Sequence, residues 1–517
     1  VTLRFAEMLK PDGKLYTENL RTARSTECYT LKGDGEEIFE PRFTFHGFRY
    51  VEVKNYPGKL TRDSITGIVI HSDMPETGTF QCSEPLINQL QSNIVWSQKG
   101  NFLDIPTDCP QRDERLGWTG DAQAFIRTAA FNMNVAPFFT KWLTDVVYAQ
   151  APDGGIPSVI PSLNTKDVDG GPAWADAFVI CPWNIYLYYG DTQLLEKMYL
   201  PLKKFVDSLD KYSVKGIRAN PFWAPPWDGY GDWLSQDSGT MKELLGTAFF
   251  AYCSKQMVGI ADATGRKKDS VHYHNLFEKV KKAFNRRFVT EDGLIVDQTQ
   301  TAYVLALHFD LLPEKLRPKM AEALVSNIKG RGWHLSTGFV GTPYLMHALS
   351  RFGKIEEAYK VLLQKTFPSW LFPVTQGATT IWERWDSWTK EKGFGDVGMN
   401  SYNHYAYGAV GDWLYAVVAG IDVDPKNPGY KHIIFRPQPG GELTYAKATL
   451  HSMYGAIVSD WKINKNKFNW KVVVPPNTTA TIYLPGDSKG KEVGSGEYKL
   501  TKKWKISHRA HRGTEKI

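Results

Sequence analysis

Residues 81–90 read Gln-Cys-Ser-Glu-Pro-Leu-Ile-Asn-Gln-Leu, and the periodicity of the chain changes within this stretch. Ser83 can cap a helix and Pro85 suits a first helical turn, so the stretch predicts the start of a helix. Before it, apolar and polar residues alternate with the period of two that is typical of strands. After it, helical spacing continues to about residue 420. The stretch therefore separates an N-terminal β region from a long helical region.

Residues 1–80 are expected to form an N-terminal β-sandwich. Residues 1–5 alternate as a half-buried strand does, and residues 42–53 alternate over most of their length. Residues 65–70 form a further expected strand. Because the chain starts within the first of these strands, we expect this domain to be truncated at its start.

Residues 81–420 are expected to form an all-α domain with an (α/α)6 barrel. Helical spacing predicts about a dozen helices, starting near residues 83, 118, 136, 172, 192, 241, 267, 297, 314, 341, 355 and 400. Long loops rich in Gly, Pro and Trp lie between some of them, and loops of that length are usually functional. An irregular α-solenoid is the alternative, although no fixed repeat period supports it.

Residues 421–517 return to short strands separated by turns, which predicts a C-terminal β-sandwich. The expected strands are 433–437, 446–449, 455–460, 468–474 and 479–484. The expected fold is therefore multidomain, with a central helical barrel between two β-sandwiches.

Composition excludes several classes of function. The net charge of +7 comes from 62 basic and 55 acidic residues, without a basic stripe interleaved with aromatics, so we expect no nucleic-acid partner. No apolar run reaches the ~18 residues of a membrane span. The five cysteines have neither disulfide-framework nor metal-site spacing, and we expect no metal and no cofactor. Phosphate-binding loops, GxSxG elbows and HExxH motifs do not occur.

The stretch 104–121 reads Asp-Ile-Pro-Thr-Asp-Cys-Pro-Gln-Arg-Asp-Glu-Arg-Leu-Gly-Trp-Thr-Gly-Asp. It combines charged side chains with turn residues and a tryptophan, which indicates a shaped loop rather than a solvated charge run. Crowded carboxylates drive their pKa values apart, as general acid/base chemistry requires, and Glu114 is a candidate acid if its pKa is raised. Asp108 and Asp121 would bind ligand hydroxyls or pair with arginines such as Arg112. A buried structural ion network is the alternative.

Two later segments add candidates. Residues 377–386 place Glu383 between tryptophans, where a plain ion pair is the alternative. Residues 401–407 place His404 among three tyrosines, where a packing role is the alternative. Further loops add Trp174, Asp228, Asp232 and Trp233. Carboxylates and aromatic faces with almost no lysine fit a neutral, hydroxyl-rich ligand.

With these motifs the chain resembles the bacterial α-L-rhamnosidases of glycoside hydrolase family 78. The stretch 108–121 is similar to that family's most specific motif, and residues 15–20, 45–50, 380–383 and 403–406 are similar to others. The likeness covers nearly the whole chain in the family's domain order. It implies a β-sandwich, an (α/α)6 barrel and a second β-sandwich.

The resemblance also implies release of terminal α-L-rhamnose with inversion. Glu114 would be the general acid, and Glu383 would be the general base that activates water. Asp108 and Asp121 would bind the rhamnose hydroxyls. The remaining candidate substrate contacts are Arg112, Trp118, Trp174, Asp232, Trp233, Trp382 and His404.

Other hypotheses stay open. An inverting glycosidase on the same barrel could accept a different sugar. A catalytically silent carbohydrate-binding protein could lose Glu114 or Glu383 without harm, and a scaffold solenoid would not need acids and aromatics in its loops. The partner is expected to be a small-molecule or oligosaccharide rhamnoside, with a homodimer as a further expectation. Secretion or a periplasmic location is favoured over the cytoplasm, and the aglycone is left undetermined.

Overall fold

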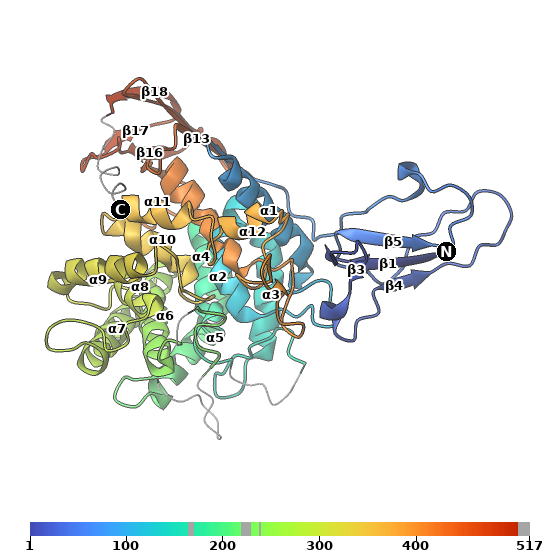
Figure 1. The fold of residues 1–517 in the computed structure, drawn as a ribbon. Coiled ribbons are helices and arrows are strands. Elements are labelled where there is room, and N and C mark those ends of the chain that lie inside the picture. Colours follow the sequence, from blue (N-terminus) through green and yellow to red (C-terminus); the bar gives the residue numbers. More distant parts are fainter. Residues whose placement is uncertain (164–169, 219–228, 237–238, 505–517) are drawn as a thin grey trace, which may run out of the picture.

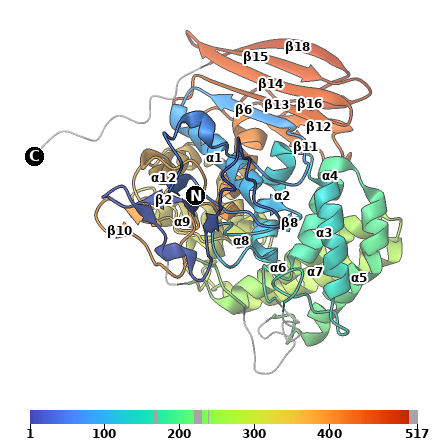
Figure 2. The same ribbon diagram turned by 90° about the vertical axis from the view of Figure 1, so that its right-hand side faces the viewer.

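The computed structural model describes residues 1–163, 170–218, 229–236 and 239–504. It has an N-terminal sheet domain, a central helical domain and a C-terminal sheet domain (Figure 1). The N-terminal domain projects from one side of the helices, and the C-terminal sheets lie over one end of them (Figures 1 and 2). The three-part organisation expected from the sequence is therefore present.

The N-terminal domain is built around strand β1 (Thr2–Ala6). It lies between β4 (Thr26–Cys28) and β5 (Tyr50–Lys54), and it is antiparallel to both. A short hairpin, β2 (Met8–Leu9) with β3 (Leu15–Tyr16), follows β1 and turns the chain toward the helical domain. A short 3-10 turn, Glu18–Leu20, follows the hairpin and precedes β4.

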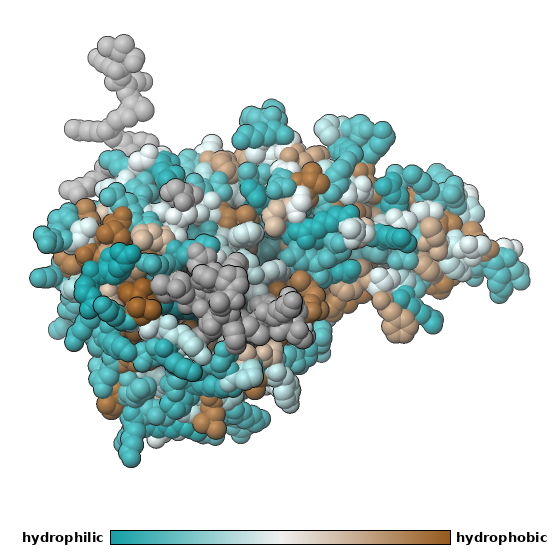
Figure 3. Space-filling model, turned by 90° about the horizontal axis from the view of Figure 1, so that it is seen from below, coloured by the Kyte–Doolittle hydropathy of each residue, from teal (hydrophilic) through white to brown (hydrophobic). Residues whose placement is uncertain are grey.

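One expected strand of this domain is confirmed in part and another is wrong. Residues 50–53 of the expected strand 42–53 belong to β5, but residues 42–49 do not, and there the amide of Gly47 donates to the Pro110 carbonyl at 3.2 Å instead of joining a ladder. A Cβ at position 47 would lie 2.6 Å from the Pro110 carbonyl carbon, so this close approach requires glycine. Residues 65–70 lie outside any strand, and Ile68, Val69 and Ile70 are more than half exposed. Figure 3 shows apolar patches on this projecting domain.

The central domain contains the helices α1 (Pro85–Asn101), α2 (Thr119–Asn132), α3 (Ala136–Ala149), α4 (Ala177–Tyr189), α5 (Thr192–Tyr212), α6 (Lys242–Ala263), α7 (Lys267–Phe288), α8 (Gln300–His308), α9 (Arg317–Gly330), α10 (Thr342–Arg351), α11 (Ile355–Leu362), α12 (Leu371–Thr375) and α13 (Gly411–Trp413). Four of them, α3, α5, α7 and α11, begin at the expected residue. The helix expected near residue 400 is instead a 3-10 turn, Ala406–Val410, followed by α13 and a π-helical turn, Leu414–Ala419.

Burial separates the central helices into two kinds. Helices α4 and α6 bury residues around most of their circumference, whereas their neighbours α5 and α7 bury one stripe. A helix that is apolar on all sides belongs inside a domain, and an amphipathic one belongs at its surface. The long loops that join them carry the residues of the candidate site. None of the helices in the described part of the chain is both long and apolar enough to cross a bilayer.

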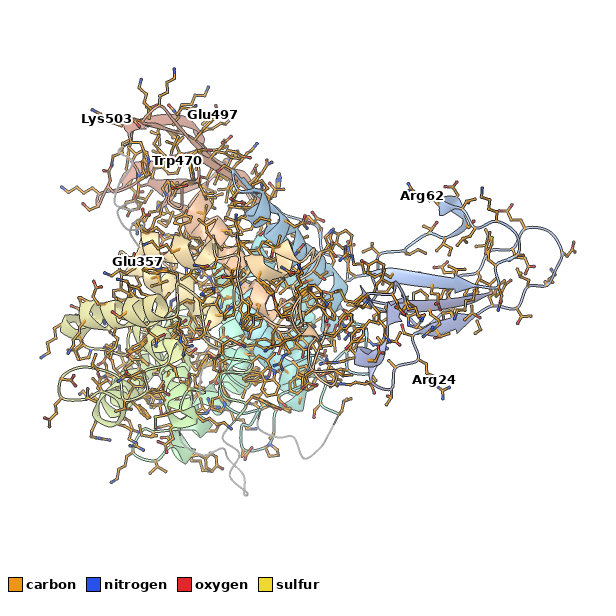
Figure 4. The ribbon with its side chains drawn as sticks, viewed as in Figure 1. Arg24, Arg62, Glu357, Trp470, Glu497 and Lys503 are labelled. Atoms are coloured by element: carbon orange, nitrogen blue, oxygen red, sulfur yellow. The ribbon has the colours of Figure 1, made fainter. Side chains whose placement is uncertain are left out.

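The C-terminal domain has two sheets. One has the order β11 (Ile421–Val423), β12 (His432–Phe435), β16 (Thr479–Ile482) and β17 (Lys491–Val493). The other has the order β18 (Gly496–Lys503), β15 (Lys467–Val474), β14 (Gly455–Asn464), β13 (Tyr445–Ser452) and β6 (Gly78–Cys82). The rings of Phe435 and Trp470, one from each sheet, lie 6.2 Å apart (Trp470 is labelled in Figure 4). Strand β6 precedes the helical domain in sequence, so its pairing with β13 ties the two ends of that domain together.

Candidate active site

The loop between α1 and α2 brings the charged motif into one place. It starts with a short hairpin, Phe102–Leu103 with Ile105–Pro106, and it ends where Trp118 precedes the first turn of α2. Cys109 and Arg115 both have positive φ, at 44° and 51°. Such backbone is costly for non-glycine residues, and strained residues of this kind cluster at functional sites.

Arg112 joins the two candidate catalytic carboxylates. Its guanidinium is 1% exposed and donates to Glu114 Oε2 through Nε at 2.8 Å. It also donates to both oxygens of Glu383, at 3.1 and 3.2 Å. Glu114 Oε2 and Glu383 Oε1 lie 2.6 and 3.2 Å from the same Nη2 atom, so these two oxygens are at most about 6 Å apart. The structure thus brings together acids that are far apart in sequence.

Three side chains donate hydrogen bonds to Glu114. Its Oε1 accepts from Trp118 Nε1 at 3.0 Å, and its Oε2 accepts from Arg112 and from Arg21 Nη1, the latter also at 3.0 Å. Burial alone would raise its pKa, but the charges of Arg112 and Arg21 and the bond from Trp118 outweigh burial and lower it. The raised pKa that the acid hypothesis required for Glu114 is therefore absent from this structure.

The raised pKa belongs to Asp108. Burial and then the charge of Glu114 raise the pKa of Asp108 well above its ordinary value. Its Oδ1 accepts from the Leu116 amide at 3.1 Å. Crowding does drive two pKa values apart, as expected, but the raised pKa is that of the aspartic acid and the lowered one is that of Glu114.

Asp121 and His404 form a buried pair, with Asp121 Oδ1 and His404 Nε2 at 3.0 Å. Burial raises the pKa of Asp121. Burial alone would lower the pKa of His404, but the hydrogen bond and the charge of Asp121 outweigh it and raise that pKa. Because both side chains are only 3% exposed, the pair is shielded from bulk water.

Asp108, Cys109 and His404 each offer one ligand atom, and these atoms lie within 4.8 Å of one another. Both ring nitrogens of His404 are already engaged, Nε2 by Asp121 at 3.0 Å and Nδ1 by the Ala406 amide at 3.4 Å. We therefore assign this group no metal.

Aromatic rings gather beside the carboxylates around Tyr230, a residue that the sequence analysis did not single out. Its ring centroid lies 4.6 Å from that of Trp174, 5.6 Å from that of Trp118 and 6.1 Å from that of Trp233. The ring of Phe339 lies 5.1 Å from that of His404. Aromatic residues are too frequent in this chain for sequence alone to separate Tyr230 and Phe339 from core residues.

Glu383 is held by its own backbone partners. Its Oε2 accepts from the Ser401 amide at 2.7 Å, and its amide donates to the Ser401 carbonyl at 2.9 Å. The carboxylate is 2% exposed. Segments 381–383 and 401–404 therefore lie side by side and place Glu383 and His404 in one site.

Two expected substrate contacts point elsewhere. Trp382 lies in a separate apolar cluster with Tyr16, Ala378 and Tyr402, where the N-terminal domain meets the helices. The carboxylate of Asp232 is occupied by the fold, because its oxygens accept from the amides of Gly338, Val340 and Gly341 and from the Thr301 hydroxyl. Asp228 lies outside the described residues.

We expect Asp232→Ala to destabilise the protein rather than to abolish chemistry. The substitution leaves buried backbone amides without acceptors, and each such group costs about 1–3 kcal/mol. Denaturant titration should show the loss, and kcat of the folded fraction should stay within about two-fold of wild type. A variant of wild-type stability with a large rise in KM would instead place Asp232 in the sugar site.

A pair of carboxylates beside aromatic faces is the arrangement that glycoside hydrolysis uses. Three family models match the chain in order: the bacterial α-L-rhamnosidase concanavalin-like domain at residues 1–71, its six-hairpin glycosidase domain at 75–418 and its C-terminal domain at 420–499. The chain therefore belongs to the bacterial α-L-rhamnosidase family, and the resemblance noted from the motifs is confirmed.

Relatives with that activity in their names match most of the chain. The α-L-rhamnosidase of Streptomyces avermitilis is 45% identical over 519 residues, which cover 97% of this chain and 49% of that protein. An α-L-rhamnosidase of Formosa agariphila is 44% identical over 494 residues, with 94% and 52% covered. This chain thus spans about half the length of these curated relatives.

Solved structures of α-L-rhamnosidases have the same fold as this chain. The S. avermitilis α-L-rhamnosidase complexed with L-rhamnose gives a TM-score of 0.92 at 44% identity, covering 97% of this chain and 49% of that one. The native enzyme of Aspergillus terreus gives 0.91 at 37% identity, covering 97% and 59%. The arrangement of all three domains is therefore that of known rhamnosidases.

Proposed function

We propose that this protein hydrolyses terminal α-L-rhamnosides with inversion, with Glu114 as general acid and Glu383 as general base. The observation that carries the proposal is that one buried arginine, Arg112, holds both carboxylates in a single site. Family membership supports rhamnose as the sugar. Inversion rests on the family resemblance alone, because the separation of at most about 6 Å between Glu114 Oε2 and Glu383 Oε1 does not reach the ~6.5–9.5 Å typical of inverting pairs. The sugar contacts would be Asp108 and Asp121, with an aromatic wall of Trp118, Trp174, Trp233 and His404.

The hydrogen bonds support a choice of reacting atoms. A carboxylate oxygen accepts about two bonds. Glu383 Oε2 has two donors, Arg112 and the Ser401 amide, whereas Oε1 has Arg112 alone among the described residues. Oε1 of Glu383 is therefore the atom that takes the proton of the attacking water. By the same reasoning Oε1 of Glu114, bonded by Trp118, carries the proton for the leaving oxygen.

The scaffold belongs to the same proposal. The central helices would pair as six inner and six outer members of an (α/α)6 barrel, between two β-sandwiches. The burial of α4 and α6 on all sides, against one-sided burial of α5 and α7, supports this arrangement. A homodimer and a secreted or periplasmic location are further proposals that rest on the sequence alone.

We expect Arg21→Met to move the alkaline limb of the kcat/KM profile to higher pH. A general acid must carry its proton, so this limb reports the pKa of Glu114 in the free enzyme. The Arg21 cation lowers that pKa, and its removal therefore raises it. Arg24→Met is the matched control, because Arg24 is exposed in the same domain (Figure 4). An unmoved limb, or one at lower pH, would contradict the assignment of Glu114.

The activity itself is tested with p-nitrophenyl α-L-rhamnopyranoside beside other p-nitrophenyl glycosides. We expect release of p-nitrophenol from the rhamnoside. If only a different glycoside is cleaved, the catalytic roles of Glu114 and Glu383 stand and the assignment of rhamnose as the sugar is wrong. Binding of rhamnose with no cleavage of any substrate would favour the silent carbohydrate-binding protein.

A further inference from the structure

The N-terminal domain reaches the candidate site through side chains as well as through packing. Arg21 contacts Glu114 directly, and its Nη2 also donates to the Gly398 carbonyl at 2.7 Å. Tyr16 stacks on Phe394 with ring centroids 3.7 Å apart. These contacts fix the inner edge of the domain against segments 394–402 of the helical domain.

Glu7, between β1 and β2, is the most buried acid that this domain contributes. It is 5% exposed and lies against residues 400–402 of the helical domain. Its Oε2 accepts from the Tyr402 amide at 3.0 Å and from Asn19 Nδ2 at 3.2 Å. Asn19 Nδ2 also donates to the Asn400 carbonyl at 3.0 Å, so two side chains of the N-terminal domain bind both ends of one turn.

The same turn holds Glu383. The Ser401 amide donates to Glu383 Oε2 at 2.7 Å, and the next amide, that of Tyr402, donates to Glu7. Consecutive amides of a chain cannot move independently. A shift of the Tyr402 amide therefore moves the donor that orients the Glu383 carboxylate.

Charge also couples Glu7 to Glu383. Burial raises the pKa of Glu7 to about 7, against the bonds from Tyr402 and Asn19 and the charge of Arg112, which lower it. The charge of Glu383 raises it further. A buried carboxylate with such a pKa is costly for the fold, and groups of this kind concentrate at functional sites.

We propose that Glu7 is a positioning residue for the reaction: by accepting the Tyr402 amide, it fixes the turn 400–402 and thereby the orientation of Glu383. The inference rests on the proposed function. It makes the N-terminal domain a working part of the active site. A displacement of about 1 Å at a reacting group can cost up to a hundred-fold in rate, so a single lost acceptor has a measurable effect.

The test compares three variants of the full chain on p-nitrophenyl α-L-rhamnopyranoside. Glu7→Met keeps the length of the side chain and removes the acceptor, and we expect kcat to fall about ten-fold with KM changed less than about two-fold. Glu7→Gln keeps an oxygen for the Tyr402 amide, and we expect it to restore kcat to within about two-fold of wild type. Glu52→Met makes the same change on β5, away from the site, and should match wild type.

Each result decides the inference. A loss of kcat in Glu7→Met, measured per folded molecule and rescued in Glu7→Gln, supports it. Wild-type kinetics in Glu7→Met, an equal loss in Glu7→Gln, or activity that falls only in proportion to folded protein would overturn it. If wild type cleaves no rhamnoside, the proposed function fails and this inference fails with it. If wild type is active and Glu7→Met has wild-type kinetics, only this inference is refuted and the proposed function stands.

Discussion

Glu114→Gln and Glu383→Gln should each lower kcat about a thousand-fold on a rhamnosyl-glucose disaccharide, within the range that general acid/base groups contribute. The two losses should differ on the p-nitrophenyl substrate. p-Nitrophenolate leaves without a proton, so Glu114→Gln should lose only about ten- to a hundred-fold there. Glu383→Gln should lose about as much on both substrates, because water must be activated in either case.

This leaving-group dependence separates the acid from the base. Glu52→Gln, an amide substitution away from the site, is the control and should retain wild-type rates on both substrates. Equal losses on the two substrates for Glu114→Gln would contradict its role as acid. A strong leaving-group dependence in Glu383→Gln would exchange the two assignments.

Arg112→Met should both inactivate and destabilise the protein. Removing one partner of a buried ion pair leaves charge without compensation and costs about 3–5 kcal/mol of unfolding free energy. Here two carboxylates, Glu114 and Glu383, lose the same cation. The denaturation midpoint should fall at neutral pH and fall less at acidic pH, where protonation of these carboxylates relieves the burial of charge.

Arg4→Met is the matched control, because Arg4 forms a partly exposed pair with Glu52. The free energy of unfolding of Arg4→Met should differ from wild type by no more than about 1 kcal/mol. A wild-type midpoint in Arg112→Met at neutral pH would show that Arg112 does not hold the two acids as described.

Much of the helical domain could be predicted from the sequence, because its helices are long and start with recognisable signals. Helix α5 begins after Asp191, whose side chain caps the Leu194 amide, and α1 has Pro85 in its first turn. The N-terminal strands were harder to predict. Residues 42–49 alternate like a strand, yet Gly47 bonds to Pro110 in another domain, and local periodicity carries no information about such a contact.

The same distinction applies to the site. The sequence singles out Glu114, Glu383 and His404 as candidates because their segments combine charge with turn residues and aromatics. It gives no such signal for Glu7 and Arg21, since nothing near them in sequence indicates that the N-terminal domain packs against residues 394–402. Asp232 has the composition of a ligand contact, and only its amide donors reveal that it supports residues 338–341.

Proton NMR of the first rhamnose released tests the central claim most directly. We expect wild type, incubated with p-nitrophenyl α-L-rhamnopyranoside in D2O, to release β-L-rhamnose first, with the α-anomer appearing later by mutarotation. A retaining pair of carboxylates, about 5–5.5 Å apart, would release the α-anomer first. That result, or no rhamnose at all, would contradict an inverting site built from Glu114 and Glu383.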